Sequence, residues 1–342
     1  MEKVTTVGLD LAKQVFQVHG ADEAGAPLFN RKLRRAEVLR FFEKLPPCLV
    51  GMEACASSHH WAREISAFGH DVRLIPPQYV KPFVRQKNDA ADAEAIVIAA
   101  QRPEMRFVEP KSEEQQAMAV LFRARERLVH QRTDLVNAIR SIFYEYGHVI
   151  PVGIHQVKRI AAILEEPKCD LPKLVQDECR DILAEIAEKT VQIEAKTRKA
   201  KELMASVDVA EQLQTMPGVG PMTALAIMAF VADIGSFRRG RDFAAWLGLV
   251  PRQHSSGGKV RLGKISKAGQ SDIRRLLIIG AMSRLNWMGQ KSIREGSWLS
   301  RLQARKPRML VAIALANKMA RAIWAMLTKG QNYKDPVLAS VA

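Results

Sequence analysis

Residues 1–110 alternate short apolar segments with amphipathic ones, and this alternation limits the possible folds more than any other feature. Apolar and β-branched runs bounded by turn residues predict five strands, at 4–10, 14–20, 27–33, 48–53 and 71–76. Patterns with helical spacing predict helices at 36–45, 57–69 and 88–101. Three strands, a helix and then strand–helix–strand–helix predict an α/β domain with a mixed sheet flanked by helices.

Two long helical patterns follow, at 112–147 and at about 171–206. The second keeps a 3–4 spacing typical of a coiled-coil seam, weakened by two threonines, through Leu183, Ile186, Thr190, Ile193, Thr197, Ala200 and Met204. Pairing of the two helices within one chain and contact between protomers explain this seam equally well. The region 111–207 is therefore interpreted as helical, with coiled-coil character.

The last region, 208–342, is predicted to be mostly helical. A helix–hairpin–helix pattern covers 212–234, and two further helices are expected at 271–287 and 306–330. Between them lies a glycine- and serine-containing loop at 255–269. The chain is thus divided into domains at 1–110, 111–207 and 208–342.

Net charge is +16, and its distribution is uneven. Residues 235–330 contain 20 Lys and Arg but three acids, whereas residues 1–234 contain 31 against 32. A basic block of this kind is typical of a protein that binds a polyanion, most often nucleic acid. A merely solubilising surface would mix the two signs.

Membrane and disulfide-rich classes are not indicated. The most apolar stretch, 309–327, is interrupted by Lys318 and Arg321, and the N-terminus lacks the apolar segment of a signal peptide. The four cysteines have no CxxC spacing, so we interpret them as reduced cytosolic thiols.

Four acids of the first domain form a candidate metal site. Asp10 and Glu53 each end an apolar strand, and Asp89 and Asp92 are spaced to share one face of a helix. If the two strands are neighbours, the four carboxylates converge without a balancing arginine. Such a set suits Mg²⁺ or Mn²⁺, and a pair of these ions supports phosphodiester chemistry. Alternatively, Asp89 only caps the helix and Asp10 only ends a turn.

The basic domain has two candidate phosphate-binding segments. Gly218 and Gly220, between two apolar helices, can present backbone N–H groups to a DNA phosphate, or simply form a tight turn. Gly257 and Gly258 allow close approach of a ligand to the loop at 255–269. The cations expected to contact nucleic acid here are Lys259, Arg261, Lys264, Lys267, Arg274 and Arg275.

Ser255 and Ser256 in this loop are candidates for either phosphate binding or nucleophilic attack. A nucleophilic serine needs activation, and His254 is the only imidazole nearby. Composition favours binding over attack, and leaves the role of His254 open.

The order of several motifs resembles the DEDD-type transposases of bacterial insertion sequences. These motifs are "GLDLAK", "VGMEAC" and "KNDAADAEAI" in the first third, then "LQTMPGVGPMTALAI", "FAAWLGLVPRQHSSGGKVRLGKISKAG" and "RRLLI" in the last. Among these transposases, the chain is similar to the insertion-sequence one-ten family and its one-eleven-eleven branch. The similarity covers roughly residues 4–108 and 208–285.

This resemblance implies a RuvC-like, RNase-H-type first domain whose DEDD acids are Asp10, Glu53, Asp89 and Asp92. It implies a nucleophilic serine in the last domain, matched by Ser256, with Ser255 as the second candidate. It further implies a cytoplasmic, nucleoid-associated bacterial recombinase acting on donor and target DNA. Finally, it implies that a structured guide RNA is a partner and that the working assembly is a tetramer, a dimer of dimers with composite sites.

Two other functions remain as alternatives. In the first, the protein is a RuvC-type, metal-dependent Holliday-junction nuclease, with water as nucleophile and Ser256 as a phosphate clamp. In the second, it is a non-catalytic nucleic-acid-binding protein, and the acids are helix caps.

Overall fold

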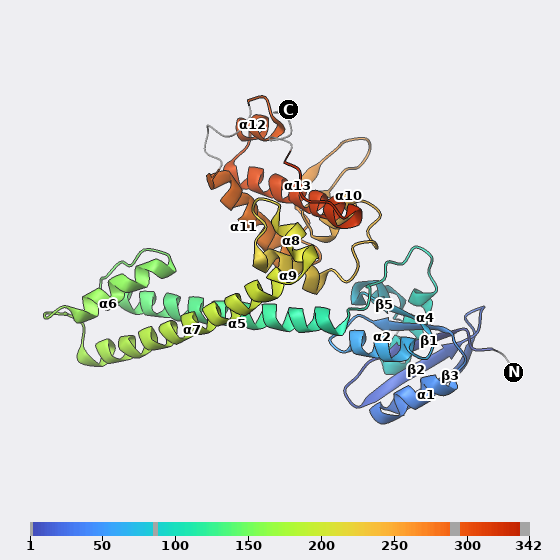
Figure 1. Cartoon of the computed structure of the whole chain (residues 1–342). Coiled ribbons are helices and arrows are strands. Elements are labelled where there is room, and N and C mark those ends of the chain that lie inside the picture. Colours follow the sequence, from blue (N-terminus) through green and yellow to red (C-terminus); the bar gives the residue numbers. More distant parts are fainter. Residues whose placement is uncertain (1–2, 85–87, 288–294, 336–342) are drawn as a thin grey trace. The chain divides into compact units, whose positions relative to one another are not determined.

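The computed structural model describes residues 3–84, 88–287 and 295–335. The chain divides into two compact units, Met1–Glu113 and Glu114–Ala342, and each is described by itself. Figure 1 shows the strands in the first unit and the long helices in the second.

The first unit is built on one five-stranded mixed sheet, as predicted, and the strand order is β3-β2-β1-β4-β5. β1 pairs antiparallel with β2 and parallel with β4, which in turn pairs parallel with β5. The strands are β1 (Thr6–Asp10), β2 (Val15–Ala21), β3 (Pro27–Arg34), β4 (Leu49–Glu53) and β5 (Asp71–Ile75).

Successive side chains of β1 and β4 point to opposite faces of the sheet, and each face has its own core. Leu9 and Val50 pack with Trp61 of α2 (Ser58–Ser66) and with Phe42 of α1 (Val38–Lys44). The other face is covered by α4 (Asp89–Ala100), which packs with residues of β5 and of α3 (Pro77–Val80). The short helices η1 (Arg35–Glu37) and η2 (Lys81–Phe83) precede α1 and follow α3.

In the second unit, α5 (Glu113–Glu145) and α7 (Lys173–Ala205) pair antiparallel within the chain (Figure 1). The segment of the chain that connects them contains η3 (Ile154–Gln156) and α6 (Val157–Glu165). Arg125 of α5 donates to Thr197, and Arg132 donates to Thr190. The two threonines that weaken the apolar seam are therefore hydrogen-bond acceptors for arginines of the facing helix. This arrangement is the intrachain one of the two alternatives.

The basic part is helical around a separate large core that includes Leu225, Phe243, Leu277 and Leu315. Helix α13 is long and apolar enough to span a membrane, but eight of its residues are buried, several of them in this core. The helices are α8 (Asp208–Gln214), α9 (Pro221–Phe230), α10 (Gly240–Trp246), α11 (Ser271–Trp287), α12 (Trp298–Gln303) and α13 (Arg308–Lys329).

The segment predicted to be a loop at 255–269 is largely a β-hairpin. Strands β6 (Pro251–Gln253) and β7 (Leu262–Ile265) pair antiparallel, and an isolated bridge joins Ser256 to Lys259 beyond them. Gly257 and Gly258 have φ of 55° and 76°. Two successive positive φ values are typical of the type I′ turn, which matches the twist of paired strands. The sequence was interpreted as indicating that Gly257 and Gly258 allow a ligand to approach, and their role in forming the turn of a hairpin was missed.

Candidate functional site: an acidic sheet edge and a basic hairpin

Asp10 and Glu53 lie at the same edge of the sheet. β1 and β4 are parallel neighbours with Leu9 opposite Met52, so the next residues of the two strands are Asp10 and Glu53. The expectation that these strands are neighbours is confirmed. Both side chains are half-buried.

Helix α4 presents the other two acids to this edge. Gln101, after its last turn, donates to Thr6 at the start of β1, whereas Ala93 in its second turn lies against Gly8. α4 therefore runs antiparallel to β1, and its first turn, which carries Asp89 and Asp92, approaches the end of the strand at Asp10. Asn88 caps this helix by accepting from the backbone N–H of Ala91, so Asp89 does not serve as the N-cap.

The electrostatics show that the acids interact. Burial raises the pKa of Asp10, and the charges of Asp92 and Asp89 raise it further. Burial likewise raises the pKa of Glu53, with added contributions from Asp10 and Asp92 and an opposing one from Lys81. Desolvation and like charge both disfavour the ionised carboxyl, and Lys81 offsets only part of this effect at Glu53.

The donor chemistry fits a hard divalent cation, because all four groups are carboxylates and none is a histidine or cysteine. Within the described ranges, however, no three Asp, Glu, His or Cys side chains lie close enough to hold one ion. Asp92 thus raises the pKa of Asp10 and of Glu53, although the acids do not form a closed ligand set in the described ranges.

Two features of this edge were missed in the sequence. Gly8 stands two residues before Asp10, and Gly51 stands two residues before Glu53. Both glycines lie on the sheet face that α4 covers. A Cβ at Gly8 would lie 2.2 Å from the Ala93 oxygen, and one at Gly51 would lie 2.9 Å from the Ala100 Cβ. The repeated pattern of glycine, one residue and an acid, in "GLD" and "GME", was a usable signal. Lys81, the cation that opposes the raised pKa of Glu53, had no comparable signal.

Ser256 lies at the tip of the hairpin in the second unit. Residues 251–264 are all exposed. The Ser256 carbonyl accepts from the backbone N–H of Lys259 at 3.0 Å and closes the turn. The Ser255 hydroxyl accepts from the Arg261 backbone N–H at 3.1 Å, whereas no hydrogen bond of the Ser256 hydroxyl is found within the described part of the chain.

His254 does not contact the Ser256 hydroxyl through any hydrogen bond in the described structure. Its ring lies against Gly263 of the facing strand, where a Cβ would be 3.0 Å from Nε2. Its backbone N–H donates to the Arg261 carbonyl.

The hairpin carries four of the predicted nucleic-acid contacts, Lys259, Arg261, Lys264 and Lys267, and all are exposed. Within the described ranges the first three have no side-chain partner. Lys267 has φ of 55°, and its backbone N–H donates to the Gly248 carbonyl.

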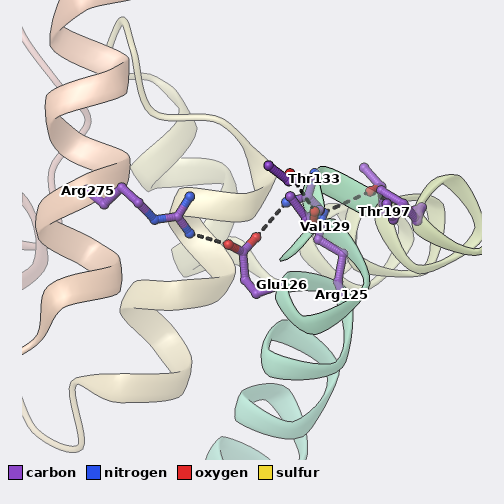
Figure 2. A network of polar contacts seen from close by, with 7 residues as sticks. Arg125, Glu126, Val129, Thr133, Thr197 and Arg275 are labelled. Carbon is purple, nitrogen blue, oxygen red and sulfur yellow. Dashed lines mark hydrogen bonds and ion pairs between the residues drawn. The ribbon is translucent and has the colours of Figure 1, made fainter. Parts of the chain in front are cut away.

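Three of the other four predicted contacts, Arg274, Arg275 and Gly218, are engaged within their own unit. Arg274 donates to two backbone carbonyls, those of Leu247 and Ala268. Arg275 pairs with the buried Glu126 of α5, which also pairs with Arg125 (Figure 2). Gly218, at φ of 90°, packs directly against the Gly280 backbone, whereas Gly220 is exposed with open space around its Cα.

Comparisons with known proteins agree with these features. The profile of the transposase IS116/IS110/IS902 family matches residues 210–295, and that of the DEDD transposase domain of the IS110 type matches residues 7–148. A probable family 20 transposase of Pseudomonas aeruginosa is 45% identical over 342 residues, 97% of this chain and 99% of that protein. The transposase for insertion sequence element IS1328 of Yersinia enterocolitica is 40% identical, over 96% of this chain and 98% of that protein. The transposase for insertion sequence element IS1111A of Coxiella burnetii is 38% identical, over 98% and 92%.

The protein, with its acidic edge on an α/β unit and its basic helical unit, is therefore an enzyme of the DNA transposase class. More particularly, the chain belongs to the IS116/IS110/IS902 family of insertion-sequence transposases. The alternative of a non-catalytic nucleic-acid-binding protein is therefore wrong.

Proposed function

We propose that this transposase is a site-specific recombinase that uses the four acids and Ser256 on the same DNA phosphodiester. The main support is the gathering of acids at a sheet edge, where Asp92 raises the pKa of both Asp10 and Glu53 through its like charge. The sheet order β3-β2-β1-β4-β5, with β2 antiparallel, supports a RuvC-like fold for the first unit.

The acids are proposed to bind Mg²⁺ or Mn²⁺. A divalent cation at the edge supplies charge neutralisation for the scissile phosphate and its leaving oxygen. The chain's own contribution is to hold Asp10 and Glu53 on rigid parallel strands, and Asp89 and Asp92 on the first turn of α4.

Ser256 is proposed as the nucleophile. Its Oγ forms a bond to phosphorus while the bond from phosphorus to one sugar oxygen breaks; the Oγ proton leaves to solvent and the sugar oxygen gains one. Its position on an exposed hairpin tip, with Lys259 and Arg261 beside it, supports delivery of the hydroxyl to a polyanion. The hydrogen bond already accepted by Ser255 makes that residue the weaker candidate.

The test separates this mechanism from a junction nuclease that uses water. The full-length protein is incubated with DNA carrying its element ends and Mg²⁺, denatured, and analysed for a protein–DNA adduct. We expect an adduct with wild type and with Ser255→Ala, and neither adduct nor strand cleavage with Ser256→Ala. Cleavage by Ser256→Ala at the wild-type rate without an adduct would identify water as the nucleophile, and cleavage with an adduct would identify another residue such as Ser255.

The choice of DNA site is proposed to come from a bound guide RNA, and the working form to be a tetramer with composite sites. Both rest on the family resemblance; the charge excess in residues 235–330 supports a nucleic-acid partner of some kind. RNA that copurifies with the protein should contain segments complementary to donor and target. Recombination at the correct sites by protein freed of RNA would contradict the RNA proposal, and light scattering of the protein–DNA complex tests the tetramer.

A further inference from the structure

The hairpin that carries Ser256 is joined to the helical core by two short backbone segments at its root. One segment, 246–249, leads into β6, and the other, 266–269, follows β7. The strands beyond the root are exposed except at Ile265, the residue of β7 next to the root. The direction in which the tip projects is therefore set by the root and not by packing of the hairpin itself.

The two root segments lie in direct backbone contact. A Cβ at Gly248 would be 2.5 Å from the backbone N and O of Ala268, and one at Gly269 would be 1.8 Å from the Trp246 oxygen. Both glycines have positive φ, 68° and 60°, a backbone conformation that residues other than glycine rarely adopt. Two backbone hydrogen bonds also cross the root, from Ser266 N–H to the Val250 carbonyl and from Lys267 N–H to the Gly248 carbonyl.

Arg274, in the first turn of α11, connects both segments to the core. Its Nη1 donates to the Leu247 carbonyl at 2.8 Å and to the Ala268 carbonyl at 2.7 Å. Its side chain is half-buried, and burial lowers its pKa. A second link is made by Asn317 of α13, whose Nδ2 donates to the Leu249 carbonyl at 3.1 Å.

From this geometry we infer that Arg274 is a positioning residue that fixes the orientation of the Ser256 hairpin, rather than a contact to nucleic acid. Its guanidinium donates to both segments of the hairpin root, so its loss removes the link that holds both of them to α11 and leaves the root less tightly fixed to the core. The inference rests on the proposed role of Ser256. It predicts that Arg274 affects the rate of attack by the serine and not the affinity for DNA.

The variant Arg274→Met keeps the length of the side chain and removes its donors. Misplacement of a reacting group by about 1 Å can reduce a rate by about 100-fold, so we expect adduct formation at saturating DNA to be slower by about that factor. The DNA dissociation constant and its salt dependence should stay at wild-type values. The exposed Arg261 is the matched control: Arg261→Met should weaken binding and reduce the slope of log K against log salt by about 0.9, as loss of one phosphate contact does.

Hydrogen exchange of the full-length proteins supplies a readout that does not depend on activity. The amides of Ser266 and Lys267 should exchange faster in Arg274→Met than in wild type, and at the wild-type rate in Arg261→Met. If Arg274→Met fails to fold, as judged by its thermal transition, Arg274→Lys is used. That variant retains the charge but has a shorter side chain, so the rate should still fall while DNA affinity is kept.

Three results would overturn the inference. The first is a wild-type rate of adduct formation in the folded Arg274 variant, and the second is unchanged hydrogen exchange of the Ser266 and Lys267 amides. The third is a fall in adduct formation that is explained entirely by weaker and less salt-dependent binding of DNA. A different result, absence of any Ser256 adduct in wild type, would reject the proposed nucleophile. In that case the exchange measurement would still decide whether Arg274 holds the root.

Discussion

Gly8 of β1 lies directly against the carbonyl oxygen of Ala93 in α4, so closely that a Cβ on Gly8 would be 2.2 Å from that oxygen. This contact brings α4 onto the sheet at the position two residues before Asp10. The same helix carries Asp89 and Asp92 in its first turn. The gathering of acids therefore depends on a backbone contact that only glycine permits.

Gly8→Ala should displace α4 and destabilise the first unit. Overpacking of a close contact typically costs about 1–3 kcal/mol, and backbone atoms cannot move aside as a flexible side chain would. We expect a lower urea midpoint for unfolding and a weaker increase in stability on addition of Mg²⁺. An unchanged urea midpoint together with wild-type stabilisation by Mg²⁺ would show that α4 is not held by this contact.

Asp92→Asn should stabilise the metal-free protein. Asp92 raises the pKa of both Asp10 and Glu53. A carboxyl with a raised folded-state pKa favours folding below its unfolded-state pKa and loses that contribution as pH rises through the raised value. The gain in Tm from the substitution, measured in EDTA, should therefore be larger at neutral pH than at pH 4.

The same variant should lose stabilisation by metal. A ligand at 100 times its Kd stabilises the folded state by about 2.7 kcal/mol, which wild type should show with Mg²⁺ or Mn²⁺. Glu104→Gln, an exposed acid of the same unit, is the control and should behave as wild type. Equal metal-induced shifts in Asp92→Asn and wild type would exclude Asp92 as a ligand.

His59 should make the first unit less stable in acid. Its Nδ1 accepts from the Lys111 backbone N–H, and burial, Lys111 and Arg63 lower its pKa to about 4. Because the folded-state pKa lies below the ordinary value of 6.5, the contribution is fully present above pH 6.5 and is lost as pH falls through about 4.

His59→Asn keeps an acceptor near the Nδ1 position and cannot titrate. The difference in unfolding free energy between wild type and this variant should therefore decrease as pH falls from 7 to 4. Urea unfolding at several pH values measures it. A difference that does not vary with pH would contradict the lowered pKa.

Glu126→Ala should destabilise the second unit. The Glu126 carboxylate is buried and pairs with Arg125 and Arg275 from two different helices (Figure 2). Hydrogen bonds to charged groups contribute about 1.5–3 kcal/mol, and partial exposure of the Arg275 side chain favours the lower end of this range. Glu188→Ala, which removes an exposed hydrogen bond to Gln192 on α7, should change stability by less than about 0.5 kcal/mol. Equal effects of the two substitutions would show that the buried ion pairs of Glu126 do not stabilise the second unit.

The sheet and the acidic edge could be predicted because their signals are local. β1 and β4 are short apolar runs, and Asp10 and Glu53 end them. A parallel pairing of neighbouring strands then suffices to bring the two acids together. The two long helices were predicted for the same reason, since their spacing extends over many turns.

The roles of the cations could not be predicted, because composition does not show what a side chain meets. Arg274 and Arg275 stand in the basic block beside Lys259 and Lys264, yet both donate to groups distant in sequence, Leu247 and Glu126 among them. The hairpin was missed because its strands are short, exposed and polar. Only the two glycines of its turn gave a signal, and that signal was interpreted as access for a ligand.

Peptide mapping of the covalent product determines whether the acids and Ser256 act on one phosphodiester. Protein incubated with element-end DNA and Mg²⁺ is denatured, digested with nuclease and protease, and analysed by mass spectrometry. We expect a nucleotide on Ser256 in wild type, and none in EDTA, in Asp10→Asn or in Asp92→Asn. A nucleotide on another residue, or undiminished modification of Ser256 in the two acid variants, would exclude joint action of the acids and Ser256.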